Sequence, residues 1–146
     1  WSAASAVCRG RPGVTREPDA VPYEGRCHCG HVGWTLHAEP QWLTRCNCSY
    51  CRRSGALWAH VSEAEISLHG NPADRIRYTH GEATLAFVSC RHCGCTTHWE
   101  NLSAGSEGQK PEETRMAVNA AMLDPDQISH LRVRHFDGAD SWDFLD

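Results

Sequence analysis

The chain has 146 residues, of which 40% are hydrophobic, and its formal net charge is −4 at pH 7. This length suits one domain with its own core. The slight excess of acidic residues argues against a protein that binds a nucleic acid backbone. No apolar run approaches the roughly 20 residues of a transmembrane helix, so no membrane partner is expected.

Residues 1–20 are predicted to form a loose N-terminal tail, and residues 21–146 a single domain. The tail contains two prolines and shows no hydrophobic period. Residues 2–7 lack the basic leader and apolar core of a signal peptide. We therefore expect a cytoplasmic protein whose cysteines stay reduced.

Alternating apolar and polar residues predict several short strands in the domain. The pattern appears first at residues 32–36, and it recurs at 66–68, 76–78 and 85–87. Residues 96–99, 116–118 and 131–133 are also expected to form strands. Asp124 and Pro125 are suited to the start of a short helix that ends near Ser129. The sequence therefore predicts an all-β domain with one or two short helical turns.

Eight of the nine cysteines fall into three tight clusters, at residues 27–29, 46–51 and 90–95. Disulfides would be favoured by an even number of cysteines and an export signal, and the chain shows neither. Thiolate sulfur is a common ligand of structural zinc. We therefore interpret the clusters as zinc sites.

Two of the clusters have the form of zinc-binding turns that end in glycine. Cys90 and Cys93 are separated by two residues, and Cys27 and Cys29 by one. Zinc takes four tetrahedral ligands in a closed structural site. Two cysteines from each turn thus predict a four-cysteine zinc that stabilises the fold.

The remaining cluster supplies Cys46, Cys48 and Cys51. Three protein ligands with an open fourth position are typical of a catalytic zinc. In one alternative, Cys95 supplies a fourth sulfur and closes the site. In another, Cys95 only fills space. The cysteine count does not separate these alternatives.

Four further residues are candidates for substrate binding near the three cysteines. Arg52 and Arg53 follow Cys51 directly and could clamp a carboxylate, although they could also only offset thiolate charge. Trp58 is close enough in sequence to line a pocket. His98 is a candidate proton shuttle. For Trp58 and His98 the alternative is a packed core residue.

The cysteine motifs resemble those of the glutathione-dependent formaldehyde-activating enzyme family, also called the centromere protein V/formaldehyde-activating family. The motifs are Cys-x-Cys-Gly at 27–30, Cys-x-Cys-x-x-Cys-Arg-Arg at 46–53, and Cys-x-x-Cys-Gly at 90–94. Residues 115–119 and 136–142 are similar to small bacterial members. Three details depart from the pattern. The middle motif is one residue shorter before Gly55, Cys95 replaces a common threonine, and Ala121 replaces a common arginine.

The resemblance implies a β-tent of small antiparallel sheets braced by two zinc ions per chain. It implies a structural zinc on the four cysteines of the outer clusters and a catalytic zinc on Cys46, Cys48 and Cys51. The implied activity is that of a carbon–sulfur lyase, which forms or cleaves a thiol–aldehyde adduct such as S-hydroxymethylglutathione. The partners would be a thiol such as glutathione and a small aldehyde such as formaldehyde.

A second hypothesis comes from a different functional class. If both metal sites are closed by protein sulfur, the domain would be a non-catalytic, zinc-braced module that binds a protein partner. The sequence gives no indication of the oligomeric state.

Overall fold

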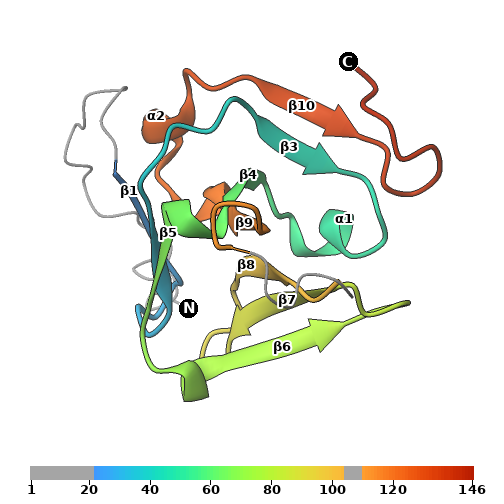
Figure 1. The fold of residues 1–146 in the computed structure, drawn as a ribbon. Coiled ribbons are helices and arrows are strands. Elements are labelled where there is room, and N and C mark those ends of the chain that lie inside the picture. Colours follow the sequence, from blue (N-terminus) through green and yellow to red (C-terminus); the bar gives the residue numbers. More distant parts are fainter. Residues whose placement is uncertain (1–21, 104–109) are drawn as a thin grey trace, which may run out of the picture.

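The computed structural model describes residues 22–103 and 110–146, which form two β-sheets joined by short helical segments (Figure 1). The predicted tail at 1–20, with Cys8 in it, lies outside the described residues. Residues 104–109 of the long polar segment also lie outside them. The prediction of an all-β fold with short helical turns is confirmed.

The smaller sheet has three antiparallel strands in the order β1-β2-β5. Its strands are β1 (Tyr23–Arg26), β2 (Gly33–Leu36) and β5 (Ile66–His69). The larger sheet has the order β10-β3-β4-β9-β8-β7-β6. Its strands are β3 (Leu43–Cys46), β4 (Trp58–Ser62), β6 (Arg75–Thr79), β7 (Leu85–Cys90), β8 (Thr96–Asn101), β9 (Arg115–Asn119) and β10 (Val133–Phe136).

Two short α-helices and three 3-10 turns connect the strands in the described part of the chain. They are α1 (Cys51–Ser54), α2 (Pro125–Ile128), η2 (Glu63–Glu65), η3 (Pro72–Asp74) and η4 (Ala120–Met122). The predicted start of α2 is confirmed, because Asp124 and Gln127 form a reciprocal capping box.

One strand pair differs from the expected antiparallel arrangement. β10 runs parallel to β3, with Val133 opposite Leu43 and Phe136 opposite Cys46. A parallel pair requires a long crossover, and most of the domain lies between these two strands in the sequence. The strand expected at residues 131–133 begins only at Val133.

The main core lies between the two sheets. Its largest fully buried side chains include Tyr23 and Trp34 from the small sheet and Leu43 from the large one. Gly25 is required beside Trp34, because a Cβ at that position would lie 2.3 Å from the indole ring. In Figure 1 the small sheet stands at one side, and the large sheet curves from β10 and β3 to β6.

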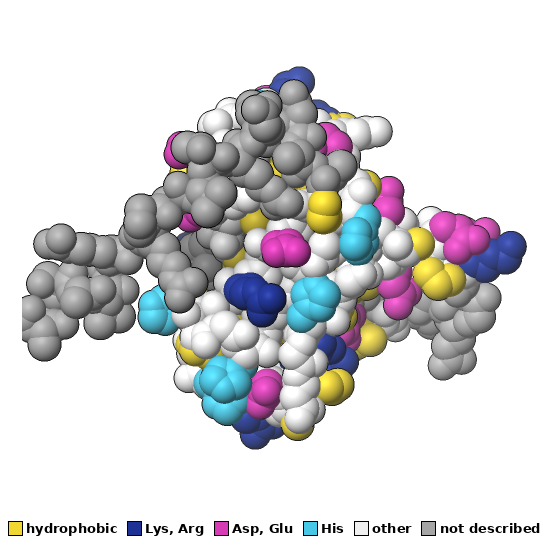
Figure 2. All heavy atoms as spheres, turned by 90° about the vertical axis from the view of Figure 1, so that its left-hand side faces the viewer, with side chains coloured by type: hydrophobic (Ala, Val, Ile, Leu, Met, Phe, Trp, Pro, Cys, Tyr) yellow, Lys and Arg dark blue, Asp and Glu magenta, His cyan; other side chains and the backbone are white. Residues whose placement is uncertain are grey.

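The outer face of the small sheet is polar and mixed in charge. Figure 2 shows acidic, basic and histidine side chains interspersed on this face, without a large area of one charge. Within the described ranges, none of the helices has the length and apolar character needed to cross a membrane.

Candidate metal centres and ligand pocket

The four cysteines of the outer clusters converge at the ends of β1 and β7. Their sulfurs, from Cys27, Cys29, Cys90 and Cys93, all lie within 4.8 Å of one another. The Cys29 sulfur is 3.6 Å from that of Cys27 and 3.5 Å from that of Cys90. Tetrahedral zinc with Zn–S bonds of about 2.3 Å requires sulfurs about 3.8 Å apart. The donor set therefore fits zinc.

N–H groups point at the sulfurs of this four-cysteine group. The backbone N–H of Val32 donates to Cys27 Sγ over 3.3 Å, and that of His92 donates to Cys90 Sγ over 3.4 Å. Backbone N–H groups that point at sulfur are compatible with metal-bound thiolates. Both turns use a glycine in the left-handed region, Gly30 with φ 84° and Gly94 with φ 75°.

The middle cluster forms a second group between the end of β3 and the start of α1. The sulfurs of Cys46, Cys48 and Cys51 lie within 4.8 Å of one another. Each accepts a hydrogen bond from nitrogen. The Cys48 backbone N–H donates to Cys46 over 3.4 Å, the Cys51 backbone N–H to Cys48 over 3.4 Å, and Trp58 Nε1–H to Cys51 over 3.2 Å.

The hydrogen bonds in this three-cysteine group shift the pKa values of Cys46 and Cys51 in opposite directions. The Cys51 thiol donates to Cys46 and, with the backbone N–H groups of Cys48 and Gly138, lowers the pKa of Cys46 to about 6. The same contact with Cys46, together with burial, raises the pKa of Cys51. The lowered pKa of Cys46 favours its thiolate, which is the form that binds a metal.

Cys95 lies beside the four-cysteine group, and the structure does not bring it to the three-cysteine group. It packs against Cys27 and Cys90, and its carbonyl accepts a hydrogen bond from the Cys90 backbone N–H over 3.0 Å. Burial and the neighbouring thiol of Cys93 raise the pKa of Cys95. Among the described residues, three sulfurs alone therefore form the second group.

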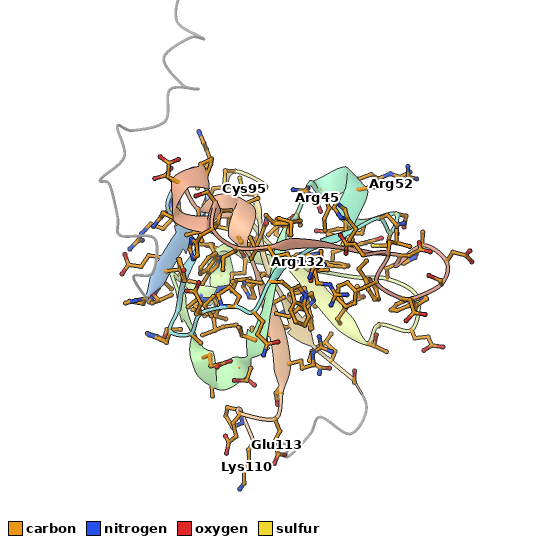
Figure 3. The ribbon with its side chains drawn as sticks, turned by 90° about the horizontal axis from the view of Figure 1, so that it is seen from above. Arg45, Arg52, Cys95, Lys110, Glu113 and Arg132 are labelled. Atoms are coloured by element: carbon orange, nitrogen blue, oxygen red, sulfur yellow. The ribbon has the colours of Figure 1, made fainter. Side chains whose placement is uncertain are left out.

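The arginines around the three cysteines are exposed. Arg45 and Arg52 extend outward from β3 and α1 (Figure 3). Arg53 is also exposed, and its Nη1 donates to the Ser49 carbonyl over 2.7 Å. The structure places Arg52 and Arg53 next to Cys51 in α1, and their role in binding a substrate stays a prediction.

The other two candidate residues lie at different distances from the site. Trp58 is buried and contacts Cys51 directly. His98 is fully buried in β8, with its ring nitrogens 2.8 Å from Thr97 Oγ1 and 3.3 Å from Glu100 Oε1. Trp99 packs with Cys51, so the neighbouring His98 points to the opposite face of the sheet. The structure therefore does not bring His98 to the three cysteines.

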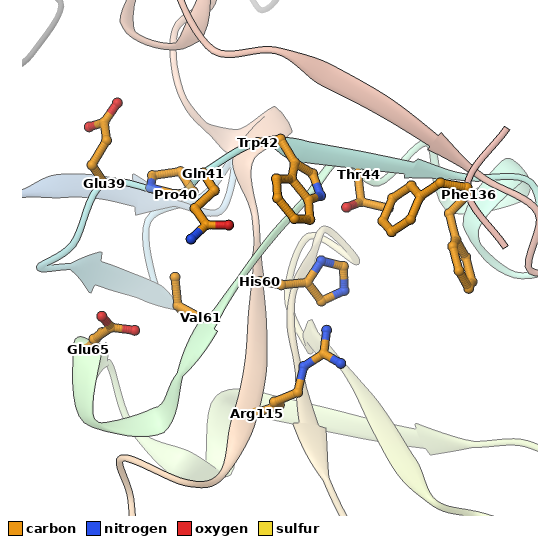
Figure 4. A pocket seen from close by; sticks show the side chains of 11 residues that line it. Glu39, Pro40, Gln41, Trp42, Thr44, His60, Val61, Glu65, Arg115 and Phe136 are labelled. Carbon is orange, nitrogen blue, oxygen red and sulfur yellow. The ribbon is translucent and has the colours of Figure 1, made fainter. Parts of the chain in front are cut away.

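A pocket of about 530 Å³ opens on the same face of the large sheet as the three cysteines (Figure 4). Polar and aromatic side chains from several strands line it, among them Trp42, Thr44, His60, Arg115 and Phe136. Our sequence analysis missed these residues. Alternation could have indicated Thr44 in β3 and His60 in β4, but neither short strand alternates regularly between apolar and polar residues.

The pocket histidine gives a pH-dependent prediction. Burial, with a contribution from Arg115, lowers the pKa of His60 to about 4, whereas the unfolded chain protonates it near 6.5. Below pH 6.5, protonation of His60 therefore favours the unfolded chain. The contribution of neutral His60 to the free energy of unfolding is complete above pH 6.5 and is lost as the pH falls toward 4. Urea unfolding at pH 7 and pH 5 should show a loss roughly 2 kcal/mol smaller in His60→Gln than in the wild type.

Both proteins carry the same cysteines, so metal loss at low pH is common to both and cancels in the comparison. Parallel stability–pH curves for the two proteins would contradict the prediction.

Gly138 gives a second prediction, because its backbone packs on the three cysteines. A Cβ at this position would lie 2.6 Å from Cys46 Sγ and 3.3 Å from Cys48 Cβ. Gly138→Ala should displace the Cys46 sulfur and lower zinc affinity about 10- to 100-fold. A competition titration with a chromogenic chelator measures this affinity. Ala139→Ser, which adds one atom at an exposed neighbouring position, is the matched control; equal affinities in the two variants would contradict the prediction.

The chain is similar to known proteins in both sequence and fold. The family model described as glutathione-dependent formaldehyde-activating enzyme matches residues 22–136, a range that contains both cysteine groups. The chain is also similar to the crystal structure of a Rhodobacter sphaeroides protein, with 26% sequence identity and a TM-score of 0.59. That match covers 76% of this chain and 99% of the other. No curated protein matches the chain.

Proposed function

Because the chain belongs to the glutathione-dependent formaldehyde-activating enzyme family, we propose that it is a zinc-dependent carbon–sulfur lyase-like enzyme. Its substrates are a small thiol such as glutathione and a small aldehyde such as formaldehyde. Its product is a thiol–aldehyde adduct such as S-hydroxymethylglutathione, and the reaction also runs in reverse. Free thiolates suit a reducing compartment, so we place the protein in the cytoplasm.

One observation carries this proposal. The three-cysteine group has three converging sulfurs, each with an N–H donor, and the described residues offer it no fourth sulfur. The four-cysteine group has a complete tetrahedral set. We therefore assign a structural zinc to Cys27, Cys29, Cys90 and Cys93, and a catalytic zinc to Cys46, Cys48 and Cys51, which makes two zinc ions per chain.

Zinc bound to the three cysteines would favour the thiolate form of a substrate thiol at the open position. In the overall reaction the thiol sulfur forms a bond to the aldehyde carbon, and the thiol proton ends on the carbonyl oxygen. No oxidant or reductant is consumed. The principal gain is proximity, because both reactants are small and must meet in one orientation.

The surrounding residues hold the site in place for this reaction. Trp58 fixes Cys51 through its indole N–H and closes the buried side of the site. Arg52 and Arg53 supply positive charge that offsets the thiolates and attracts an anionic thiol. His98 stabilises β8 of the large sheet through hydrogen bonds to Thr97 and Glu100.

The test is exchange spectroscopy on ¹³C-labelled formaldehyde mixed with glutathione. Zinc-loaded protein should speed the exchange between free formaldehyde and S-hydroxymethylglutathione. S-methylglutathione, which has no free thiol, should give no S-hydroxymethyl signal. An unchanged exchange rate with two zinc ions bound per chain would overturn the proposal and favour the non-catalytic zinc-braced module.

A further inference from the structure

The pocket beside the three cysteines contains hydrogen-bonding groups that the folded chain leaves unused. Thr44 is among the residues that line the pocket; it is only 2% exposed, and its buried hydroxyl has no hydrogen-bond partner. A buried hydroxyl without a partner costs about 1–3 kcal/mol, so such groups usually have a ligand or a water. Thr44 therefore points to a ligand with a polar atom at this place.

A cation lies on the same pocket without a carboxylate partner. The guanidinium group of Arg115, an exposed residue of β9, forms no ion pair or side-chain hydrogen bond with any residue that the structure describes. In Figure 4 its guanidinium group points into the pocket toward the ring of His60. Because His60 stays neutral at pH 7, its ring adds a hydrogen-bond donor but no second charge. This end of the pocket thus suits one anionic group.

The two acidic residues of the pocket already have partners. Glu39 accepts from Tyr23 and lies 2.9 Å from His130 Nε2, and Glu65 accepts from the backbone N–H and hydroxyl of Ser62. Figure 4 shows both on the side of the pocket away from Thr44. They do not neutralise Arg115.

The pocket lies close enough to the three cysteines to serve the same ligand. Thr44 and Cys46 are alternate residues of β3, so both side chains lie on one face, about 7 Å apart along the strand. Trp58, opposite Thr44, contacts Cys51. The Phe136 ring and Cys46 lie close together beside Gly138, because a Cβ added at Gly138 would be 2.6 Å from Cys46 Sγ and 3.6 Å from Phe136 Cδ1. A molecule of tripeptide size spans this distance.

We propose that this pocket is the carboxylate subsite for the thiol substrate, with Arg115 as the cation and Thr44 and His60 as hydrogen-bond donors. The planar guanidinium group matches a carboxylate in a bidentate pair. The aromatic rings of Trp42 and Phe136 pack on the apolar part of the ligand. This inference rests on the proposed function for the identity of the ligand.

The test measures binding of S-methylglutathione by calorimetry in zinc-loaded protein. Arg115→Gln should weaken binding about tenfold or more, since a hydrogen-bonded charge pair is lost. The matched control is Arg132→Gln, an exposed arginine outside the pocket (Figure 3); its affinity should equal that of the wild type. Thr44→Val, which keeps the side-chain shape, should weaken binding severalfold. In NMR spectra of the wild type, the indole N–H signal of Trp42 should shift when S-methylglutathione is added.

Equal affinities for Arg115→Gln and Arg132→Gln would overturn the subsite, as would the absence of measurable binding by the wild type. S-methylglutathione cannot form the adduct, so this result is independent of catalysis. Binding that depends on Arg115, without faster formaldehyde exchange, would leave the subsite standing and reject the proposed function. Faster formaldehyde exchange, with binding that is insensitive to Arg115, would support the proposed function and reject the subsite.

Discussion

The Cys90→Ser protein is expected to be unfolded under conditions in which the wild type is folded. Cys90 is fully buried and joins the turn after β7 to the turn after β1 through the four-cysteine group. A structural zinc contributes about 10–16 kcal/mol, whereas a domain is stable by only about 5–15 kcal/mol. Loss of this metal therefore removes most or all of the stability.

Far-UV circular dichroism and elemental analysis of zinc per chain measure the effect. The matched control is Cys95→Ser, because Cys95 packs on the same group but is outside its set of four sulfurs. The control should fold and keep both zinc ions. A Cys90→Ser protein that melts like the wild type with two zinc ions bound would refute the structural role.

Removal of a sulfur from the three-cysteine group should abolish activity but leave the chain folded. Cys48→Ala is expected to lose one zinc per chain and all acceleration of formaldehyde exchange, while the fold remains. Cys48 is only partly buried, and its group lies at the end of β3, outside the core between the two sheets. Two sulfurs alone hold zinc far more weakly than three, so the site should empty.

Zinc per chain, thiol titration and circular dichroism of the same sample separate the two outcomes. Cys95→Ser is again the control. If Cys95→Ser also releases one zinc and, like Cys48→Ala, loses the acceleration of formaldehyde exchange while it stays folded, Cys95 is a ligand of the three-cysteine site, which is then closed by protein. In that case the open position at this metal would be rejected.

The two groups suggest why one chain keeps both a closed and an open set of sulfurs. The four-cysteine group connects strands from both sheets, so a metal bound there would add to the core packing of a small, loop-rich domain. The three-cysteine group is built from one short segment, β3 to α1, and needs no other strand to supply a ligand. In the function proposed above, a metal on the first group would stabilise the fold while a metal on the second stays open to a substrate.

The sequence by itself determined the features that depend on near neighbours in the chain. The spacing of Cys46, Cys48 and Cys51 brings their sulfurs together within one turn, and the glycines after Cys29 and Cys93 allow the turns on which those thiols converge. Alternation of side chains likewise predicted most of the strands, because the period of two is a property of the extended backbone itself.

Only the tertiary structure decided features that depend on the pairing of distant strands. Cys95 follows Cys93 in sequence but could have turned toward either group, and its packing against Cys27 places it beside the first. Arg115 and Thr44 meet on one pocket because β4 pairs with both β3 and β9. Register fixes which faces coincide, and no hairpin turn sets it between β4 and β9, which lie far apart in the sequence. The same pairing turns His98 away from the three cysteines.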